Sequence, residues 1–302
     1  MDKQNTNLGK QAILGLQHLL AMYSGAVAVP MLIGTALHFN SAQMTYLISI
    51  DIFMCGLATA VQLFRNKYFG IGLPVVLGCA IQAVAPLQMI GQHFSITTMY
   101  GAIIVAGIFV VLISSQFARI KKLFPPVVTG SLITVIGLSL IPIAFQNIGG
   151  GNSLAKNFGD IKCLATGFAT VLIILAFQAF GKGFLKSISI LLGLIFGTMI
   201  ASTLGMVSLE PVAQASWFHL PQPFYFGAPS FEISSCITMI IIAVVSMVES
   251  TGVFLAIGNI INKDITKQDL TKGYRAEGLA QILGGIFNTF PYTTFSNNVG
   301  VL

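Results

Sequence analysis

Eight runs of about twenty apolar residues follow one another along the chain, and this pattern restricts the fold more than any other feature. A run of this length crosses the hydrocarbon core of a bilayer as an α-helix. Lys and Arg number 15 and Asp and Glu number 9, so charged residues make up 8% of the chain, whereas soluble domains carry about 25%. So few charges cannot cover a water-facing surface. The sequence therefore excludes a soluble globular protein and predicts an all-α polytopic membrane protein.

The predicted spans lie between polar clusters. They cover residues 11–34, 43–64, 71–91, 97–117, 125–146, 162–180, 186–207 and 232–258. A ninth, less apolar segment covers 275–290, and a tenth begins before the chain ends. All Lys and Arg residues except Lys156 and Lys162 fall on the same side as the N-terminus. By the positive-inside rule, the N-terminus is expected in the cytoplasm, and the net charge of +6 reflects topology rather than a nucleic-acid partner.

Two predicted spans are broken. Pro74 and several glycines interrupt residues 70–86, and Pro291 precedes a Thr- and Tyr-rich stretch near the end of the chain. Both segments favour a short strand followed by a half-helix. They are the third and tenth spans, seven apart, which indicates an inverted seven-span repeat. Irregular backbone at membrane depth is tolerated where it lines a cavity, so this pairing predicts a binding site near the midplane.

Glu249 is the most informative acid, because it lies near the middle of the eighth span, which contains no Lys or Arg. A carboxyl group at that depth costs at least about 2.5 kcal/mol and needs a reason. A substrate or proton site is the favoured interpretation; the alternative is a protonated glutamate that bonds a neighbouring helix. Ser250, Thr251 and Gly252 follow it directly and would supply hydroxyl groups and a close backbone approach.

Other polar groups leave two interpretations open. Asp51 is either a hydrogen-bonding group between packed helices or a coupling group. Glu277 either opens the ninth span as a helix-start charge, paired with the nearby basic cluster, or has a function. His18 either makes a structural hydrogen bond or carries a proton. Glu232 begins the eighth span as an N-terminal acid, and Asp269 is expected in a loop.

The chain contains no recognisable catalytic or metal-binding motif. Its four scattered cysteines show no paired spacing, and no catalytic triad or HExxH pattern is present. We therefore predict no enzyme activity, no metal site and no cofactor.

Four segments together resemble a known family. They are G-L-Q-H at 15–18, L-P-V-V-L-G-C at 73–79, M-V-E-S-T-G at 247–252 and F-N-T-F-P-Y-T-T-F-S at 287–296. The chain resembles, over its whole length, the bacterial xanthine permeases of the nucleobase-ascorbate transporter family, also called nucleobase:cation symporters of the second class. This resemblance implies fourteen spans in two inverted repeats, a multi-pass protein of the bacterial inner membrane and a homodimer. It implies a core domain at 1–122 and 232–302, a gate domain at 123–207 and an outer loop at 208–231.

The resemblance also implies proton-coupled purine uptake, with xanthine as the first candidate and uric acid as the second. The substrate-binding positions that it implies are Glu249, Asn297, Asn298, Ala80, Ile81 and Gln82. Glu249 would accept hydrogen bonds from the ring N–H groups of the purine. Glu277 and His18 are the implied candidates for proton coupling or support. Asn297 replaces the usual Gln of the family, and Ile81 replaces a common aromatic residue, so the contacts to the purine ring differ here.

The chain ends at Leu302, inside the tenth span, before spans 11–14 of the family. We expect that residues 1–302 alone, with the second repeat incomplete, do not transport. An alternative of another class is a non-transporting membrane subunit that packs against an intact permease. Such a subunit would co-purify with a permease and bind no purine.

Overall fold

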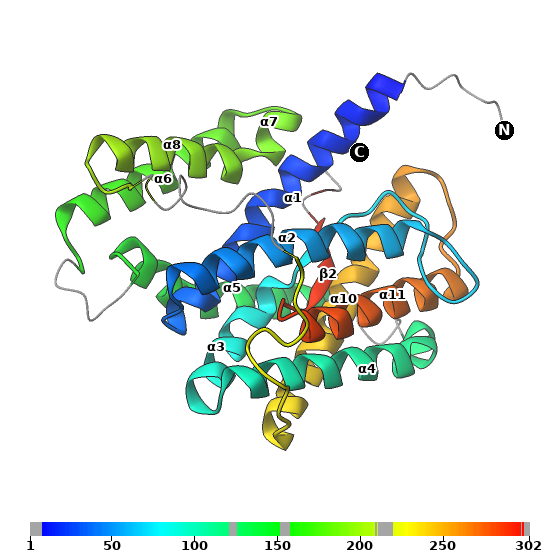
Figure 1. Ribbon diagram of the computed structural model, residues 1–302. Helices are drawn as coiled ribbons and strands as arrows, with labels where there is room; N and C mark the ends of the chain where they lie inside the picture. Colours follow the sequence, from blue (N-terminus) through cyan, green and yellow to red (C-terminus); the bar gives the residue numbers. More distant parts are fainter. Residues whose placement is uncertain are drawn as a thin grey trace.

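The apolar runs form long helices. The computed structural model describes residues 8–120, 126–151, 158–208, 210, 220–296 and 298 (Figure 1). The longer helices are α1 (Leu8–Ala36), α2 (Ser41–Leu63), α4 (Ile96–Ile120), α5 (Pro126–Ile148), α6 (Ile161–Phe180), α10 (Ile233–Ile260) and α11 (Lys267–Ile286). The shorter elements are β1 (Leu77–Cys79), η1 (Ile81–Ala83), α3 (Val84–His93), α7 (Phe184–Ser187), α8 (Ser189–Thr203) and β2 (Tyr292–Thr294). Within the described residues, five helices are long and apolar enough to cross a membrane, namely α1, α2, α4, α6 and α10.

The outer faces of these helices are apolar. Leu112 on α4 is 71% exposed and Phe180 at the end of α6 is 86% exposed. Large apolar side chains that point away from the protein in such numbers would be unfavourable in water. They suit a hydrocarbon environment, so the exposed faces agree with the multi-pass membrane protein that the sequence predicts.

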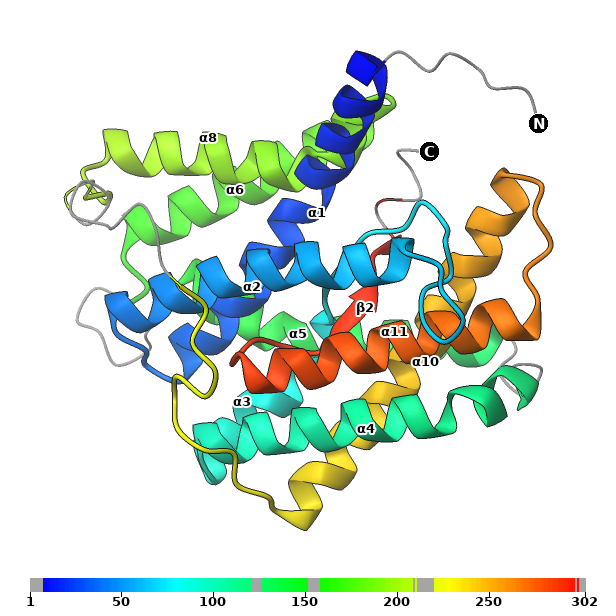
Figure 2. The same cartoon turned by 45° about the vertical axis from the view of Figure 1, so that its right-hand side comes forward.

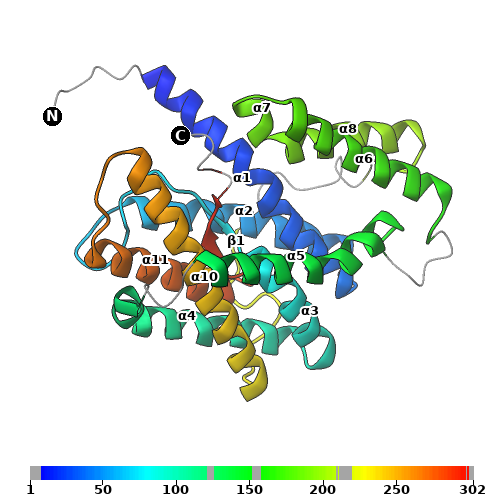
Figure 3. The ribbon, with the colours of Figure 1, turned by 180° about the vertical axis from the view of Figure 1, so that it is seen from behind.

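The helices surround the two short strands. Helix α4 packs along α11 and α10, α2 packs against α1 and α11, and α6 packs against α8. Figure 2 shows α11 and α4 running side by side below α2, with β2 between them and α1. Seen from behind, α6, α7 and α8 form a separate group beside α1 (Figure 3). The strands therefore lie inside one group of helices, formed by α1–α4, α10 and α11.

Strands β1 and β2 come from the two segments for which the sequence predicts extended backbone. They pair antiparallel, with Gly78 opposite Thr293. The Ala80 N–H donates to the Pro291 carbonyl and the Phe295 N–H to the Val76 carbonyl, which extends the ladder at both ends. The ladder satisfies backbone groups that have no water to bond at this depth. Helix α3 begins at Val84, after the single turn η1, and gives the half-helix predicted for this span.

Two helix boundaries differ from the prediction. Helix α11 begins at Lys267, eight residues before the predicted start at 275, because Thr266 and Asp269 form a reciprocal capping box. The first two turns are polar, so a search for apolar runs misses them. Asp269 is therefore a buried helix residue, not a loop residue, and pairs with Arg65 at 2.7 Å. The seventh predicted span, 186–207, is divided into α7 and α8 and ends at Thr203.

Glu232 is the N-cap of α10, which confirms the predicted N-terminal acid. Its carboxylate accepts hydrogen bonds from the Ser234 hydroxyl at 2.6 Å and from the backbone N–H groups of Ser235 and Ser234 at 2.7 and 3.0 Å. These bonds, the hydroxyl first, lower the pKa of Glu232 from 4.5 to about 2.

The lowered pKa of Glu232 predicts a pH-dependent contribution to stability. A depressed carboxyl pKa stabilises the fold above the unfolded value of 4.5, and this contribution disappears as the pH falls toward 2. We expect Glu232→Gln to lower the thermal midpoint of the detergent-solubilised chain at pH 7. The difference in thermal midpoint between the variant and the wild type should become smaller as the pH falls from 5 to 2. A difference that stays constant over this range would contradict the assignment.

Candidate functional site

The crossing of the two broken spans forms the centre of the candidate site. Helices α1 and α2 contact β1, and helices α10 and α11 contact β2. Four helices and two strands, which are far apart in the sequence, thus bring their polar side chains to one buried region. This agrees with the midplane location expected for paired broken spans.

Glu249 projects from α10 toward η1 of the third span. The Gln82 amide Nε2 donates to Glu249 Oε2 at 3.0 Å and to Ser246 Oγ at 2.8 Å. Glu249 is partly buried, and among the described residues nothing donates a hydrogen bond to its other oxygen, Oε1. Ile81, next to Gln82, is 39% exposed. The structure thus holds one carboxylate oxygen in place and leaves the second available beside an accessible apolar side chain.

Glu277 lies in the middle of α11 and is 3% exposed. Its Oε1 accepts hydrogen bonds from the hydroxyls of Ser250 at 2.7 Å and Thr294 at 2.6 Å. Ser250 and Thr293 also share a hydrogen bond at 3.0 Å. One carboxyl group therefore connects α10, α11 and β2, through a serine that follows Glu249 in the sequence.

Two expectations for Glu277 are wrong. Glu277 does not open its helix, because α11 begins ten residues earlier, at Lys267. Arg275 donates to Ser114 of α4, so it does not neutralise Glu277. Ser250 bonds to Glu277 and to Thr293. No atom lies within 4 Å of a Cβ placed on Gly252, so the backbone there is open on that side.

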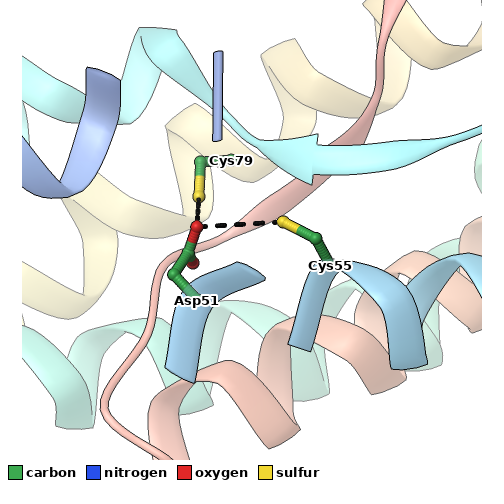
Figure 4. Close-up of side chains that lie close together, drawn as sticks. All are labelled: Asp51, Cys55 and Cys79. Carbon is green, nitrogen blue, oxygen red and sulfur yellow. Dashed lines mark hydrogen bonds between the residues drawn. The ribbon is translucent and has the colours of Figure 1, made fainter. Parts of the chain in front are cut away.

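Asp51 is a hydrogen-bond acceptor shared by three elements. Its Oδ1 accepts from the Tyr292 hydroxyl of β2 at 3.0 Å. Its Oδ2 accepts from the Cys79 thiol of β1 at 2.8 Å and lies 3.8 Å from the Cys55 sulfur of α2 (Figure 4). All four side chains are buried. Of the two interpretations left open by the sequence, the geometry favours the hydrogen-bonding group between packed segments.

The absence of a paired cysteine spacing is thus misleading, because the fold places Cys55 and Cys79 on the same carboxylate. The ligand atoms of Asp51, Cys55 and Cys79 all lie within 4.8 Å of one another, and such a set could hold a metal ion. Hydrogen bonds among the three groups explain the cluster without one, so we assign it a structural role. It fixes both strands to α2.

His18 of α1 and Asn298 lie together. The Asn298 amide donates to the His18 backbone carbonyl at 2.9 Å and lies 3.2 Å from the ring nitrogen Nδ1. This supports the structural interpretation of His18 and places Asn298 against α1. Asn298 Oδ1 is buried and has no partner within the described part of the chain. Asn297, the other predicted position in this segment, lies outside the described residues. Ala80 is buried and contributes its backbone to the strand ladder.

Phe295 is a site residue that the sequence analysis missed. A Cβ atom placed on Gly78 would lie 2.3 Å from its ring, and one placed on Gly25 of α1 would lie 2.9 Å away. The ring therefore fills the space between α1 and β1, which only glycine leaves open at both positions. The signal was present in the sequence as a phenylalanine directly after the Tyr-Thr-Thr segment.

Comparisons with known proteins agree on the kind of molecule. A family model described as "Permease family" matches residues 9–302. The chain is 53% identical over 294 residues to the xanthine permease of Bacillus subtilis, which covers 97% of this chain and 67% of that protein. It is 52% identical over 300 residues to the uric acid permease PucK of the same organism, and this match covers 99% of this chain and 70% of that protein. The chain spans about two thirds of the length of these relatives.

Solved structures show the same fold at low sequence identity. The transmembrane domain of the cyanobacterial bicarbonate transporter BicA matches with a TM-score of 0.63 at 15% identity, over 95% of this chain and 76% of that chain. The structure of SLC26A9 matches with a TM-score of 0.56 at 15% identity, over 95% of this chain and 50% of that chain. At these identities the likeness concerns the fold alone, a transporter-type helical membrane architecture.

Proposed function

The chain belongs to this permease family, as its motifs predict, and on this premise we propose that it is a purine permease for xanthine or uric acid in a bacterial cell membrane. The proposal takes its substrate from the two Bacillus relatives, a xanthine permease and a uric acid permease. A permease family also agrees with the prediction of a transporter rather than an enzyme.

The observation that carries the proposal is the half-occupied carboxylate of Glu249. Gln82 holds Oε2, which orients the carboxyl plane, and no described residue donates to Oε1, which leaves it for a ligand. A purine of the xanthine type carries ring N–H donors, for which a carboxylate is a strong acceptor. The apolar faces of the ring would contact Ile81, which is accessible beside Gln82.

Proton coupling forms a further part of the proposal. Glu249 and Glu277 are acids at membrane depth, and no Lys or Arg within the described segments forms an ion pair with either. A carboxyl group without a cationic partner can gain and lose a proton as the purine binds and leaves. We assign proton exchange to this acid pair, with His18 as a supporting group. Alternating access, a cytoplasmic N-terminus and a homodimer complete the proposed arrangement.

Equilibrium binding tests the proposal. Membranes that contain the chain are incubated with radiolabelled xanthine, and unlabelled xanthine, uric acid and uracil are added as competitors. We expect saturable binding, displaced by xanthine and uric acid at concentrations at least about tenfold below those needed for uracil, whose single ring fills less of a purine site. Membranes without the chain are the control. Absence of saturable binding, or displacement by uracil at the same concentration as xanthine, would rule out the assignment.

A further inference from the structure

A basic cavity lies away from the purine site, at the end of the helix pair α4 and α11. Its volume is about 560 Å³. The residues that line it are Lys67, Ser115, Arg119, Lys267, Gln268, Thr271, Lys272 and Arg275. They come from the loop after α2, the last turns of α4 and the first turns of α11, which lie together at the right of Figure 2. We call this cavity the basic pocket.

Five of the eight lining residues are cations and none is an acid. Asp269, the acid closest in sequence on α11, is engaged by Arg65, which does not line the pocket. Within the described part of the chain, none of the five cations forms an ion pair. Cations gathered around one cavity repel each other, and this repulsion is relieved when an anion binds. Helix α11 begins at Lys267, so the positive end of its dipole adds to the same field.

The surface next to the basic pocket shows what kind of anion fits. Leu112, Ser115 and Arg119 are spaced three and four residues apart and share one face of α4. Leu112 is 71% exposed. Ile108, one turn further down the helix, is 45% exposed. An apolar stripe thus leads directly into the basic pocket along one helix face. This arrangement matches a phospholipid, with its phosphate among the cations and its acyl chains along the stripe.

We propose that the basic pocket binds phosphate, supplied by the headgroup of an anionic phospholipid in the leaflet on the N-terminal side. The positive-inside pattern alone requires only that cations lie on this side of the membrane. It does not require five of them to line one cavity without acids. Basic pockets between membrane helices are a known type of site for anionic headgroups. This proposal is independent of the purine site, because the lining residues do not include any residue assigned to it.

Lipid retention measured by native mass spectrometry tests the proposal. The wild-type chain is extracted from bilayers that contain equal amounts of phosphatidylcholine and phosphatidylglycerol. We expect phosphatidylglycerol to remain bound at least about tenfold more often than phosphatidylcholine, and the preference to disappear in the double variant Arg119→Gln, Lys272→Gln. The matched control is Lys182→Gln, Lys186→Gln, which removes two exposed cations of the same membrane side outside the pocket and should keep the preference.

A second measurement uses the wild type only and therefore does not depend on the folding of a variant. Phosphatidylglycerol or inorganic phosphate is added to the chain in phosphatidylcholine nanodiscs, and the thermal midpoint is recorded. A rise with phosphatidylglycerol alone identifies the lipid as the source of the phosphate, and a rise with inorganic phosphate identifies a soluble anion in the same pocket. The proposal would be overturned if neither phosphatidylglycerol nor inorganic phosphate raised the thermal midpoint. It would also be overturned if the wild type retained both lipids equally, or if the control variant Lys182→Gln, Lys186→Gln lost the lipid preference as the pocket variant does.

Discussion

Glu249→Gln is expected to weaken xanthine binding by roughly 10- to 100-fold while the chain remains folded. The substitution keeps the size of the side chain and leaves an amide that can still bond Gln82, but it removes the charge. A hydrogen bond to a charged group contributes about 1.5–3 kcal/mol, and Oε1 would accept one such bond from a ring N–H of the purine. Binding of radiolabelled xanthine should therefore weaken by roughly 10- to 100-fold.

The control for this experiment is Glu232→Gln at the start of the same helix. It removes the same charge from a half-buried N-cap and should leave xanthine binding unchanged at neutral pH. Glu249→Asp provides a graded test, because it retains the charge but shortens the reach, and we expect partial binding. If Glu249→Gln bound xanthine with wild-type affinity, the carboxylate would not be the ligand group and the proposed site would be wrong.

Gly278→Val is expected to cause a large loss of stability at the interface between α4 and α11. A Cβ atom on Gly278 would lie 2.8 Å from Val111 Cγ2, 2.9 Å from the Gly107 carbonyl oxygen and 3.0 Å from the Val111 backbone nitrogen. Two of these three atoms belong to the backbone, so a side-chain rotation cannot relieve the overlap. Helices in membranes associate through such small residues.

Overpacking of a tight interface costs about 1–3 kcal/mol, and we expect a value near 3 kcal/mol here because the helices must separate. The neighbouring Glu277 would shift with α11, so its bonds to Ser250 and Thr294 would weaken as well. The thermal midpoint of the solubilised chain measures the loss. Gly252→Ala on α10 is the control, because no atom lies within 4 Å of its added Cβ. Alanine is the better helix former, so the control should be neutral or slightly stabilising.

Similar thermal midpoints for Gly278→Val and Gly252→Ala would show that α4 and α11 do not depend on close contact. Glu249→Gln and Gly278→Val together separate stability from function. Glu249→Gln should weaken xanthine binding at an unchanged thermal midpoint, whereas Gly278→Val should lower the thermal midpoint.

The sequence predicts the features that depend on local composition. Runs of apolar residues gave the long helices, because only a helix satisfies its own backbone in lipid. Pro74 and Pro291 marked the two segments where β1 and β2 lie, because proline and clustered glycines disfavour continuous helix. Four short motifs, one of them around Glu249, together indicated the family. These signals lie in neighbouring residues and need no knowledge of distant contacts.

Contacts between distant segments could not be predicted in this way. Asp51, Cys55 and Cys79 meet only because β1 folds back against α2, and the carboxylate of Glu277 is placed by hydroxyls from α10 and β2. The start of α11 depended on a polar capping box rather than on apolar residues.

By itself, the sequence determined that this chain lies in a membrane, which segments break their helices and which acid is unpaired within its span. Only the tertiary structure decided that Gln82 orients Glu249, that Phe295 fills the space over Gly78, and that five cations line one cavity. The physical reason is that hydropathy and backbone propensity act over a few neighbouring residues, whereas hydrogen bonds and charge fields depend on distances that the fold sets.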